Sequence, residues 1–235
     1  MSTGKDRETL ERLLAMRFAA HPWHGVPIGD RAPEEVAVYV EIVPTDAIKY
    51  ELDKSAGHLR IDRPQLYSSF SPTLYGFIPQ TFCGKSVGAR SAERTGRKEI
   101  EGDGDPMDIC VLSERDVSHS GVLLRARPIG GLRMIDGNQA DDKIIAVLCE
   151  DTAYGHLQDV SELPPGMLDR FRHYFLTYKQ MPGAKRPVEI PEVYDREEAH
   201  EMVRRSQADY AKEFGHPSER VKTLLSLLAL DDRPR

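Results

Sequence analysis

The chain has 235 residues, of which 40% are hydrophobic and 30% charged, and its formal net charge is -6. This balance is typical of a globular protein, and the acidic excess argues against a general nucleic-acid binder. No apolar stretch reaches the roughly 18 residues that a membrane-spanning helix requires. A chain of this length can bury about 70% of its unfolded surface, so it needs neither a disulfide nor a structural metal to fold.

The cysteines and the N-terminus indicate a reducing compartment. Cys83, Cys110 and Cys149 are odd in number, and no two of them have the spacing of a zinc ribbon. Residues 1–20 mix charged and apolar side chains and lack the continuous apolar core of a signal peptide. We therefore expect a cytoplasmic protein with free thiols.

The first third of the chain predicts one helix followed by short strands. Apolar residues recur at helical spacing over Arg7 to Ala20, which predicts an N-terminal helix. The segment His21 to Ala32 is rich in proline and glycine and reads as a loop. Alternating apolar and polar side chains then predict strands over Val36 to Val43, Ile48 to Leu52 and Leu59 to Asp62.

The middle of the chain is strand-rich and the last third is helical. We predict a mobile surface loop over Gly84 to Gly104, which is polar, charged and rich in glycine. The short strands favour a small antiparallel barrel or sandwich with flanking helices. The strands are predicted over Met107 to Leu112, Val122 to Ala126, Gly131 to Ile135 and Lys143 to Leu148, and the helices over Pro165 to Met181, Asp195 to Gly215 and Val221 to Leu230.

The strongest chemical signal is the hexapeptide Asp103-Gly104-Asp105-Pro106-Met107-Asp108, which precedes an apolar strand. A bend at Pro106 would bring its three carboxylates together, and carboxylates held close repel one another unless a cation lies between them. Oxygen ligands alone would select a hard cation such as Mg²⁺, Mn²⁺ or Ca²⁺. The alternative interpretation is an acidic surface turn, a common feature of globular proteins.

A second acidic turn lies between two later strands and contains Asp136, Asp141 and Asp142, followed by Lys143. Taken alone, it is more typical of a solvated hairpin turn. Two such turns in one small barrel favour a site in which neighbouring metal ions bind a phosphate group.

The early strands carry a further set of charges. Lys49 and Glu51 share one face of their strand, and Glu41 lies on the polar face of the preceding strand. If these strands pair, one surface carries two acids and a base, although a solvated cross-strand ion pair explains the same pattern. Three further groups each have an ordinary structural explanation when taken alone: Arg63, Tyr75-Gly76 and Tyr178-Lys179.

Taken together, these pieces resemble the soluble family I inorganic pyrophosphatases. The motif Asp-Gly-Asp-Pro-apolar-Asp, the most specific of that family, is intact at Asp103 to Asp108. The resemblance covers about Val36 to Met181. It extends to Val40-Glu41-Ile42, Ile48-Lys49-Tyr50-Glu51, Asp62-Arg63, Leu74-Tyr75-Gly76-Phe77-Ile78-Pro79, Asp136 with Asp141 and Lys143, His156 to Pro164, and Tyr174-Phe175 leading to Tyr178-Lys179.

The resemblance implies a fold and an activity. The expected fold is mainly β, a five-stranded antiparallel barrel of the OB type with N- and C-terminal helices. The expected enzyme is an inorganic diphosphatase that hydrolyses pyrophosphate to two orthophosphates with several Mg²⁺ ions, for which Mn²⁺ can substitute. We expect one domain over 1–235, with a core over about 36–181, a surface insertion over about 84–102 and extensions at both ends. We also expect a homo-oligomer with no nucleic-acid or membrane partner.

The resemblance also implies a role for each matching residue. Asp105 would accept the proton of the attacking water, and Tyr75 belongs to the catalytic and substrate-binding set. The expected metal ligands are Asp103, Asp108, Asp136 and Asp141, with Glu41 and Glu51 binding through water or orienting the bases. The expected phosphate-binding residues are Lys49, Arg63, Lys143, Tyr178 and Lys179, of which Lys49, Arg63 and Lys143 also assist catalysis.

One departure and two rival functions follow from the same residues. The family usually has a tyrosine four residues before Tyr75, where this chain has Ser71, so we expect a gap in the phosphate shell. A phosphatase with Asp103 or Asp105 as covalent nucleophile would need a doubly wound parallel sheet, which the run of strands does not favour. A non-enzymatic barrel that binds Ca²⁺ or an oligonucleotide is poorly matched by 7% aromatic residues and the acidic charge.

Overall fold

The computed structural model describes residues 20–179 and 188–216, together with 219, 223 and 226. The predicted N-terminal helix and most of the leucine-rich tail lie outside the described residues. The strands are β1 (Val36–Ile42), β2 (Ile48–Leu52), β3 (Leu59–Pro64), β4 (Leu74–Phe77), β5 (Glu101–Gly102), β6 (Asp108–Leu112), β7 (Val122–Asp136), β8 (Gln139–Ala140), β9 (Lys143–Leu148) and β10 (Val188–Tyr194). The α-helices are α2 (Lys85–Thr95), α3 (Met167–Thr177) and α4 (Arg196–Phe214), and Val160–Glu162 forms a 3-10 turn.

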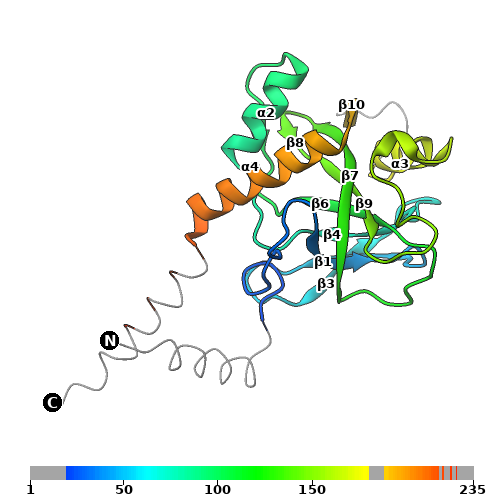
Figure 1. Cartoon of the computed structure of the whole chain (residues 1–235), viewed down its shortest axis with the longest axis horizontal. Helices are drawn as coiled ribbons and strands as arrows, with labels where there is room; N and C mark the ends of the chain where they lie inside the picture. The colour runs from blue at the N-terminus through cyan, green and yellow to red at the C-terminus, as the bar shows by residue number, and fades with distance from the viewer. Residues whose placement is uncertain (1–19, 180–187, 217–218, 220–222, 224–225, 227–235) are drawn as a thin grey trace.

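Five strands close into a ring in the order β1, β4, β6, β9 and β7, with β7 pairing back onto β1 (Figure 1). The protein is mainly β with helices, as expected, but the ring is not wholly antiparallel because β6 and β9 are parallel. Neighbours in a closed ring can all alternate in direction only when the number of strands is even. A ring of five therefore requires one parallel pair. The prediction of an entirely antiparallel arrangement was wrong at that pair.

Two glycines allow the strands of the ring to meet other chain segments closely. A Cβ atom on Gly76 of β4 would lie 1.9 Å from the carbonyl oxygen of Tyr39 on β1. A Cβ atom on Gly131 of β7 would lie 2.3 Å from the ring of Tyr194 on β10. Real Cβ atoms do not approach backbone atoms this closely, so only glycine fits at position 76, whereas a side chain at position 131 would require the Tyr194 ring to move.

Strand alternation divides the apolar side chains between two layers. Ile144 and Ala146 of β9 join a cluster with the valines of β1. The alternate residues Ile145 and Val147 point to the opposite face and belong to a cluster with Phe171 and other residues of α3. Because both faces of β9 are covered, its sequence is a continuous apolar run rather than an alternating one.

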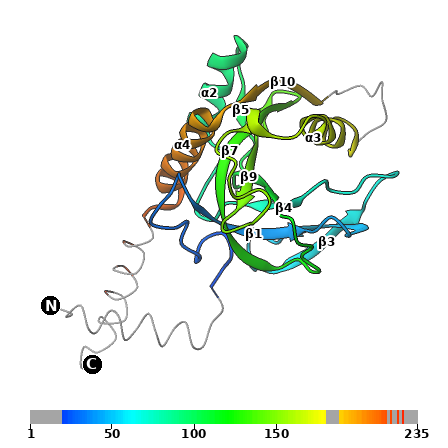
Figure 2. The ribbon, with the colours of Figure 1, turned by 45° about the vertical axis from the view of Figure 1, so that its right-hand side comes forward.

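The segment Gly84 to Gly104 is not a mobile loop, contrary to the prediction, because it contains helix α2 and strand β5. Gly84 provides no side-chain cap for α2. Instead, Asp209 of α4 accepts hydrogen bonds from the backbone N–H groups of Ser86 and Val87, at 2.8 and 3.1 Å. Figures 1 and 2 show α2 and α4 side by side on one flank of the ring. A cap supplied from so far along the chain leaves no local sequence signal.

Most other predicted elements match the structure within a few residues, with three differences. β7 is one long strand where two were predicted, because its register shifts between Pro128 and Gly130 without ending the strand. No strand was predicted at β4 or at β10. Helix α4 buries the predicted apolar stripe, Ala199, Met202, Val203 and Tyr210.

The hairpin of β2 and β3 forms a separate two-stranded sheet, in which Lys49 lies opposite Arg63. In the described structure β2 does not pair with β1, so the shared sheet face considered for Glu41, Lys49 and Glu51 is not formed as a ladder. Glu41 reaches the hairpin differently, since its Oε1 accepts a hydrogen bond from the backbone N–H of Leu52 at 2.7 Å. A hydrogen bond from the backbone of the hairpin to a side chain of β1 therefore links the hairpin to the ring.

Candidate active site

A cavity of about 220 Å³ lies where the hairpin, the ring and the end of α3 meet. Its walls come from segments that are distant in sequence. Every predicted site residue except Arg63 lines it. The lining residues are Glu41, Lys49, Glu51, Leu52, Lys54, Tyr75, Phe77, Asp103, Asp105, Pro106, Asp108, Asp136, Gln139, Asp141, Lys143, Tyr178 and Lys179.

The acidic hexapeptide forms a tight turn that is held from behind. Gly104 has a φ of +79°, and the backbone N–H of Asp105 donates to Oδ1 of Asp103 at 2.9 Å. Cys83 brackets the turn, since its N–H donates to the Asp105 carbonyl at 2.8 Å and its carbonyl accepts from the Gly104 N–H at 3.0 Å. Met107 is completely buried behind the turn. The bend therefore brings all three carboxylates to one cavity, as the motif predicts.

A buried lysine joins the two acidic turns. The parallel register of β6 and β9 places Lys143 opposite Asp108. The Lys143 Nζ donates to Oδ2 of Asp108 at 2.5 Å and also to Oδ1 of Asp141. Burial alone would lower the pKa of Lys143, but the charges of Asp108 and Asp141 hold that pKa well above its ordinary value. Lys143 is therefore a fixed positive charge inside the cavity.

Tyr75 is held as a hydrogen-bond donor at the same point. Its hydroxyl donates to Oδ2 of Asp108 at 2.6 Å. Burial, followed by the charges of Asp108 and other neighbours, raises the pKa of Tyr75 well above its usual value. The phenol therefore stays protonated, and its hydrogen bond fixes the direction of the Asp108 carboxylate.

Two of the carboxyl groups resist ionisation in this environment. Burial and the charges of Asp141 and Asp108 raise the pKa of Asp103 to about 8. Burial, followed by the charge of Asp108, raises the pKa of Glu41 to about 8 despite the hydrogen bond from Leu52. Seven acidic side chains and four lysines line the cavity, so an additional cation would reduce the repulsion among the acids.

The donor chemistry fits a hard divalent cation, although the acids are not yet gathered around one point. Among the described residues no three His, Cys, Asp or Glu side chains converge in a geometry that would hold a metal ion. Lysines hold the acids instead: Lys179 is 2.9 Å from Oδ2 of Asp136 and 3.6 Å from Oδ2 of Asp141. All candidate donors are carboxylate oxygens, the ligand type that Mg²⁺ and Mn²⁺ prefer.

Basic side chains of the hairpin form the opposite rim. The Lys49 Nζ lies 2.8 Å from Oδ2 of Asp62 and 3.9 Å from Oε1 of Glu51. The Lys49 hydrogen bond holds the pKa of Asp62 below its ordinary value. Arg63 does not line the cavity; its Nη1 donates to the Pro64 carbonyl at 3.4 Å. It lies directly across the hairpin from Lys49.

Sequence reasoning missed two polar lining residues, Lys54 and Gln139. The Lys54 Nζ forms an ion pair with Oδ1 of Asp105. Lys54 belongs to the turn between β2 and β3, where Oδ1 of Asp53 accepts from the N–H groups of Ser55 and Ala56. A turn lysine has no local feature that distinguishes it from a solvated one, so only the folded hairpin brings it to Asp105.

Ser71 stands apart from this cavity. It is 3% exposed, and its hydroxyl donates to the Thr73 carbonyl at 2.8 Å. It does not line the cavity. The gap expected in the phosphate shell at this position therefore stays a prediction.

The family model described as inorganic pyrophosphatase matches residues 38–211, most of the chain. The chain belongs to the inorganic pyrophosphatase family. The prediction of this family, and of an inorganic diphosphatase, is confirmed. The matched range extends beyond Met181, where the sequence resemblance ended, so β10 and most of α4 lie within the family match.

Relatives and solved structures of pyrophosphatases agree with this membership. The inorganic pyrophosphatase of Chlamydia trachomatis is 47% identical over 200 residues, which cover 83% of this chain and 96% of the relative. Soluble inorganic pyrophosphatase 3 of Arabidopsis thaliana is 38% identical over 211 residues, covering 90% of this chain and 88% of the relative. The crystal structure of the Thermus thermophilus inorganic pyrophosphatase superposes with a TM-score of 0.67 at 34% identity, covering 80% of this chain and 98% of that one.

Proposed function

We propose that this pyrophosphatase hydrolyses inorganic pyrophosphate to two orthophosphates with Mg²⁺ at the cavity described above. One observation carries the proposal: two acidic turns and several lysines face a single small cavity. A polyanionic substrate cannot bind to carboxylates directly, whereas metal ions can join the two. The ring of strands also speaks against a covalent phosphatase of the doubly wound type.

The metal ligands are proposed to be Asp103, Asp108, Asp136 and Asp141, with Glu41 and Glu51 binding through water or orienting the bases. Mn²⁺ is the expected substitute for Mg²⁺. When bound, several such ions would neutralise phosphate oxygens and lower the pKa of the attacking water. The raised pKa values of Asp103 and Glu41 are consistent with this assignment, because burial, and secondarily the neighbouring acids, disfavour the charged carboxylates in the absence of a cation.

The chain's own residues would carry the proton and hold the substrate. Asp105 is the proposed acceptor of the water proton, since it lines the cavity and its side chain remains 41% exposed. Lys143 of β9, Lys179 after α3 and Lys49 of the hairpin bring positive charge to the cavity lining. Arg63, opposite Lys49 on the hairpin, is proposed to reach the phosphate from outside that lining. Tyr178 and Tyr75 add hydroxyl donors, which allows phosphate oxygens to be held from several directions.

Several broader inferences accompany this function. We interpret the five-stranded ring as an OB-type barrel and the chain as one domain over 1–235, and we expect it to form a homo-oligomer without nucleic-acid or membrane partners. No helix in the described ranges is long and apolar enough to cross a membrane. The three free thiols support a cytoplasmic location. Light scattering on the full-length chain checks the oligomer.

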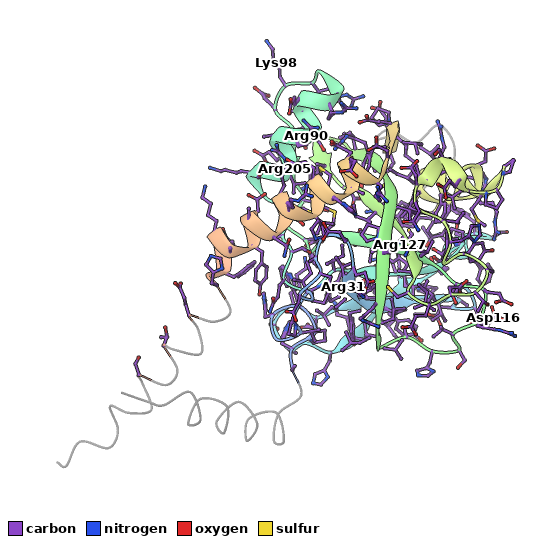
Figure 3. The ribbon with its side chains drawn as sticks, viewed as in Figure 1. Arg31, Arg90, Lys98, Asp116, Arg127 and Arg205 are labelled. Carbon is purple, nitrogen blue, oxygen red and sulfur yellow. The ribbon has the colours of Figure 1, made fainter. Side chains whose placement is uncertain are left out.

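Phosphate release from pyrophosphate, with Mg²⁺ and with added chelator, tests the proposed function. We expect hydrolysis only when free Mg²⁺ is present, and little action on p-nitrophenyl phosphate. Lys143→Met should lose most activity, because it removes the fixed charge between the acidic turns. Asp116→Asn, an exposed change labelled at the far edge of Figure 3, serves as the control and should retain activity. Equal turnover of the monoester and pyrophosphate would contradict the proposed specificity.

A further inference from the structure

Arg133 of β7 forms a buried ion pair directly behind the second acidic turn. Both Arg133 and Asp142 have completely buried side chains, and the Arg133 Nη1 lies 3.0 Å from Oδ2 of Asp142. The other oxygen of Asp142 accepts a hydrogen bond from the backbone N–H of Met134 at 3.3 Å. Neither residue lines the cavity. The pair is costly to bury, so its position next to two cavity residues calls for an explanation.

Asp142 stands between two residues of the cavity. Asp141 and Lys143 both line it, whereas Asp142 points to the opposite side and meets Arg133. Successive side chains of an extended segment point in opposite directions. Fixing the middle side chain therefore fixes the rotation of the backbone about its own axis, and with it the direction of both neighbours. The backbone contact from the Asp141 N–H to the Met134 carbonyl, at 2.9 Å, completes the attachment.

Helix α4 and strand β10 hold Arg133 from the other side. Its Nε lies 3.0 Å from Oε2 of Glu192 on β10, and its Nη2 pairs with Oε1 of Glu198 on α4. Each glutamate is in turn paired with an arginine of α2: Glu198 with Arg90 and Glu192 with Arg94. Arg90 is labelled between α2 and α4 in Figure 3. The guanidinium thus connects the α2 and α4 flank to the acidic turn.

We propose that Arg133 is a positioning residue, which acts through Asp142 to aim Asp141 and Lys143 into the cavity. The inference rests on the proposed function, because it takes Asp141 and Lys143 as metal and phosphate groups. The proposal also assigns a role to the insertion over about 84–102, because the arginines of α2 pair with the two glutamates that hold Arg133. Residues behind a binding group commonly change affinity by about 10- to 100-fold when removed.

Asp142→Ala removes the anchor while Arg133 keeps two carboxylate partners, so no buried charge is left unpaired. We expect the variant to remain folded by circular dichroism. Calorimetric titrations with Mg²⁺ alone, and with inorganic phosphate in the presence of Mg²⁺, should show affinities reduced by about 10-fold or more. Asp142→Asn keeps the shape and one oxygen acceptor, so it should restore most of the lost affinity.

The matched control is Glu192→Ala, which removes a carboxylate from the same arginine on the side away from the cavity. It should lower the melting temperature while leaving both affinities within about twofold. Unchanged affinities in Asp142→Ala, or equal losses in the two variants, would overturn the proposal.

A second variant keeps the test decisive if Asp142→Ala does not fold. Arg133→Lys retains the charge, but its ammonium lacks the planar fork of the guanidinium and cannot hold the Asp142 carboxylate in the same direction. The same weakening of Mg²⁺ and phosphate binding is expected, and unchanged affinities would refute the positioning role. Lys143→Met distinguishes a failure of the proposed function from a failure of the positioning proposal. If that variant retains full activity, the proposed site roles fail rather than the role of Arg133.

Discussion

At the residue scale, three aspartates of one hexapeptide have different surroundings and therefore different chemistry. Asp103 is deep in the cavity among other acids, and its pKa is raised to about 8. Asp108 is fixed by Tyr75 and Lys143. The Asp105 side chain is 41% exposed and pairs with Lys54, which is similarly exposed. An exposed ion pair of this kind adds little stability, so Asp105 is free to exchange Lys54 for a reacting water.

Asp105→Asn tests the proton acceptor directly. The change keeps the shape of the side chain and removes its basicity, so kcat should fall by about 10²- to 10⁴-fold while Mg²⁺ binding survives. Asp108→Asn should instead weaken Mg²⁺ affinity first, because it removes a ligand charge. Activity measured across Mg²⁺ concentrations at saturating pyrophosphate separates the two. Recovery of normal turnover by Asp105→Asn at high Mg²⁺ would show that Asp105 is only a ligand.

At the scale of single elements, close strand crossings decide where glycine must stand. Gly76→Ala would place a Cβ atom 1.9 Å from the Tyr39 carbonyl oxygen, so β1 and β4 would have to separate. We expect a loss of about 3 kcal/mol or more in unfolding free energy, measured by urea denaturation. Gly96→Ala is the comparison, because Gly96 has a positive φ but no neighbour within 4 Å and should lose only about 1 kcal/mol. Similar losses in both would exclude a steric cause.

Helix α4 carries a buried histidine that should make stability depend on pH. His200 is 6% exposed, and its Nε2 has no hydrogen-bond partner in the described structure. Burial lowers the pKa of His200 below 6.5; Arg204 and Arg196 lower it further, and Glu197 and Glu34 oppose this. The unfolded chain therefore binds the proton more readily than the folded one, so stability is present above about pH 6.5 and is lost as the pH falls through that value.

The measurement is the difference in melting temperature between pH 7.5 and pH 5.5. His200→Leu should shrink this difference, because leucine has no proton to bind. The exposed His119→Leu is the control and should leave the difference unchanged. An unaltered difference in His200→Leu would place the acid sensitivity elsewhere in the chain.

At the scale of the whole molecule, folding and metal binding should be separable. Two large apolar clusters hold the ring and helices together, so we expect a chelator to abolish activity and leave the circular dichroism spectrum unchanged. Mg²⁺ should stabilise the folded state by mass action and so raise the melting temperature. At 100 times its dissociation constant, the gain in unfolding free energy should be about 2.7 kcal/mol. Ca²⁺ should inhibit, because it prefers longer and looser coordination. Full activity with Ca²⁺ as the only divalent ion would contradict this prediction.

The sequence by itself determined the chemistry of the site. The hexapeptide at Asp103 to Asp108 requires a tight turn at Gly104, and such a turn gathers carboxylates wherever it occurs. The strands β1, β2 and β9 could be predicted because alternating or continuous apolar residues are local properties of the sequence. The resemblance of the hexapeptide and the accompanying motifs to those of pyrophosphatases was therefore sufficient to indicate the family and most cavity residues.

Only the tertiary structure decided how distant segments meet. Helix α2 is capped by Asp209 from α4, and Lys54 reaches Asp105 only after β2 and β3 have paired. The buried pair of Arg133 and Asp142 looks like two ordinary surface charges in the sequence. The parallel contact of β6 and β9 follows from closing a ring of five strands, a condition that no single segment contains. Such contacts are non-local, so their energies depend on segments that a local pattern does not include.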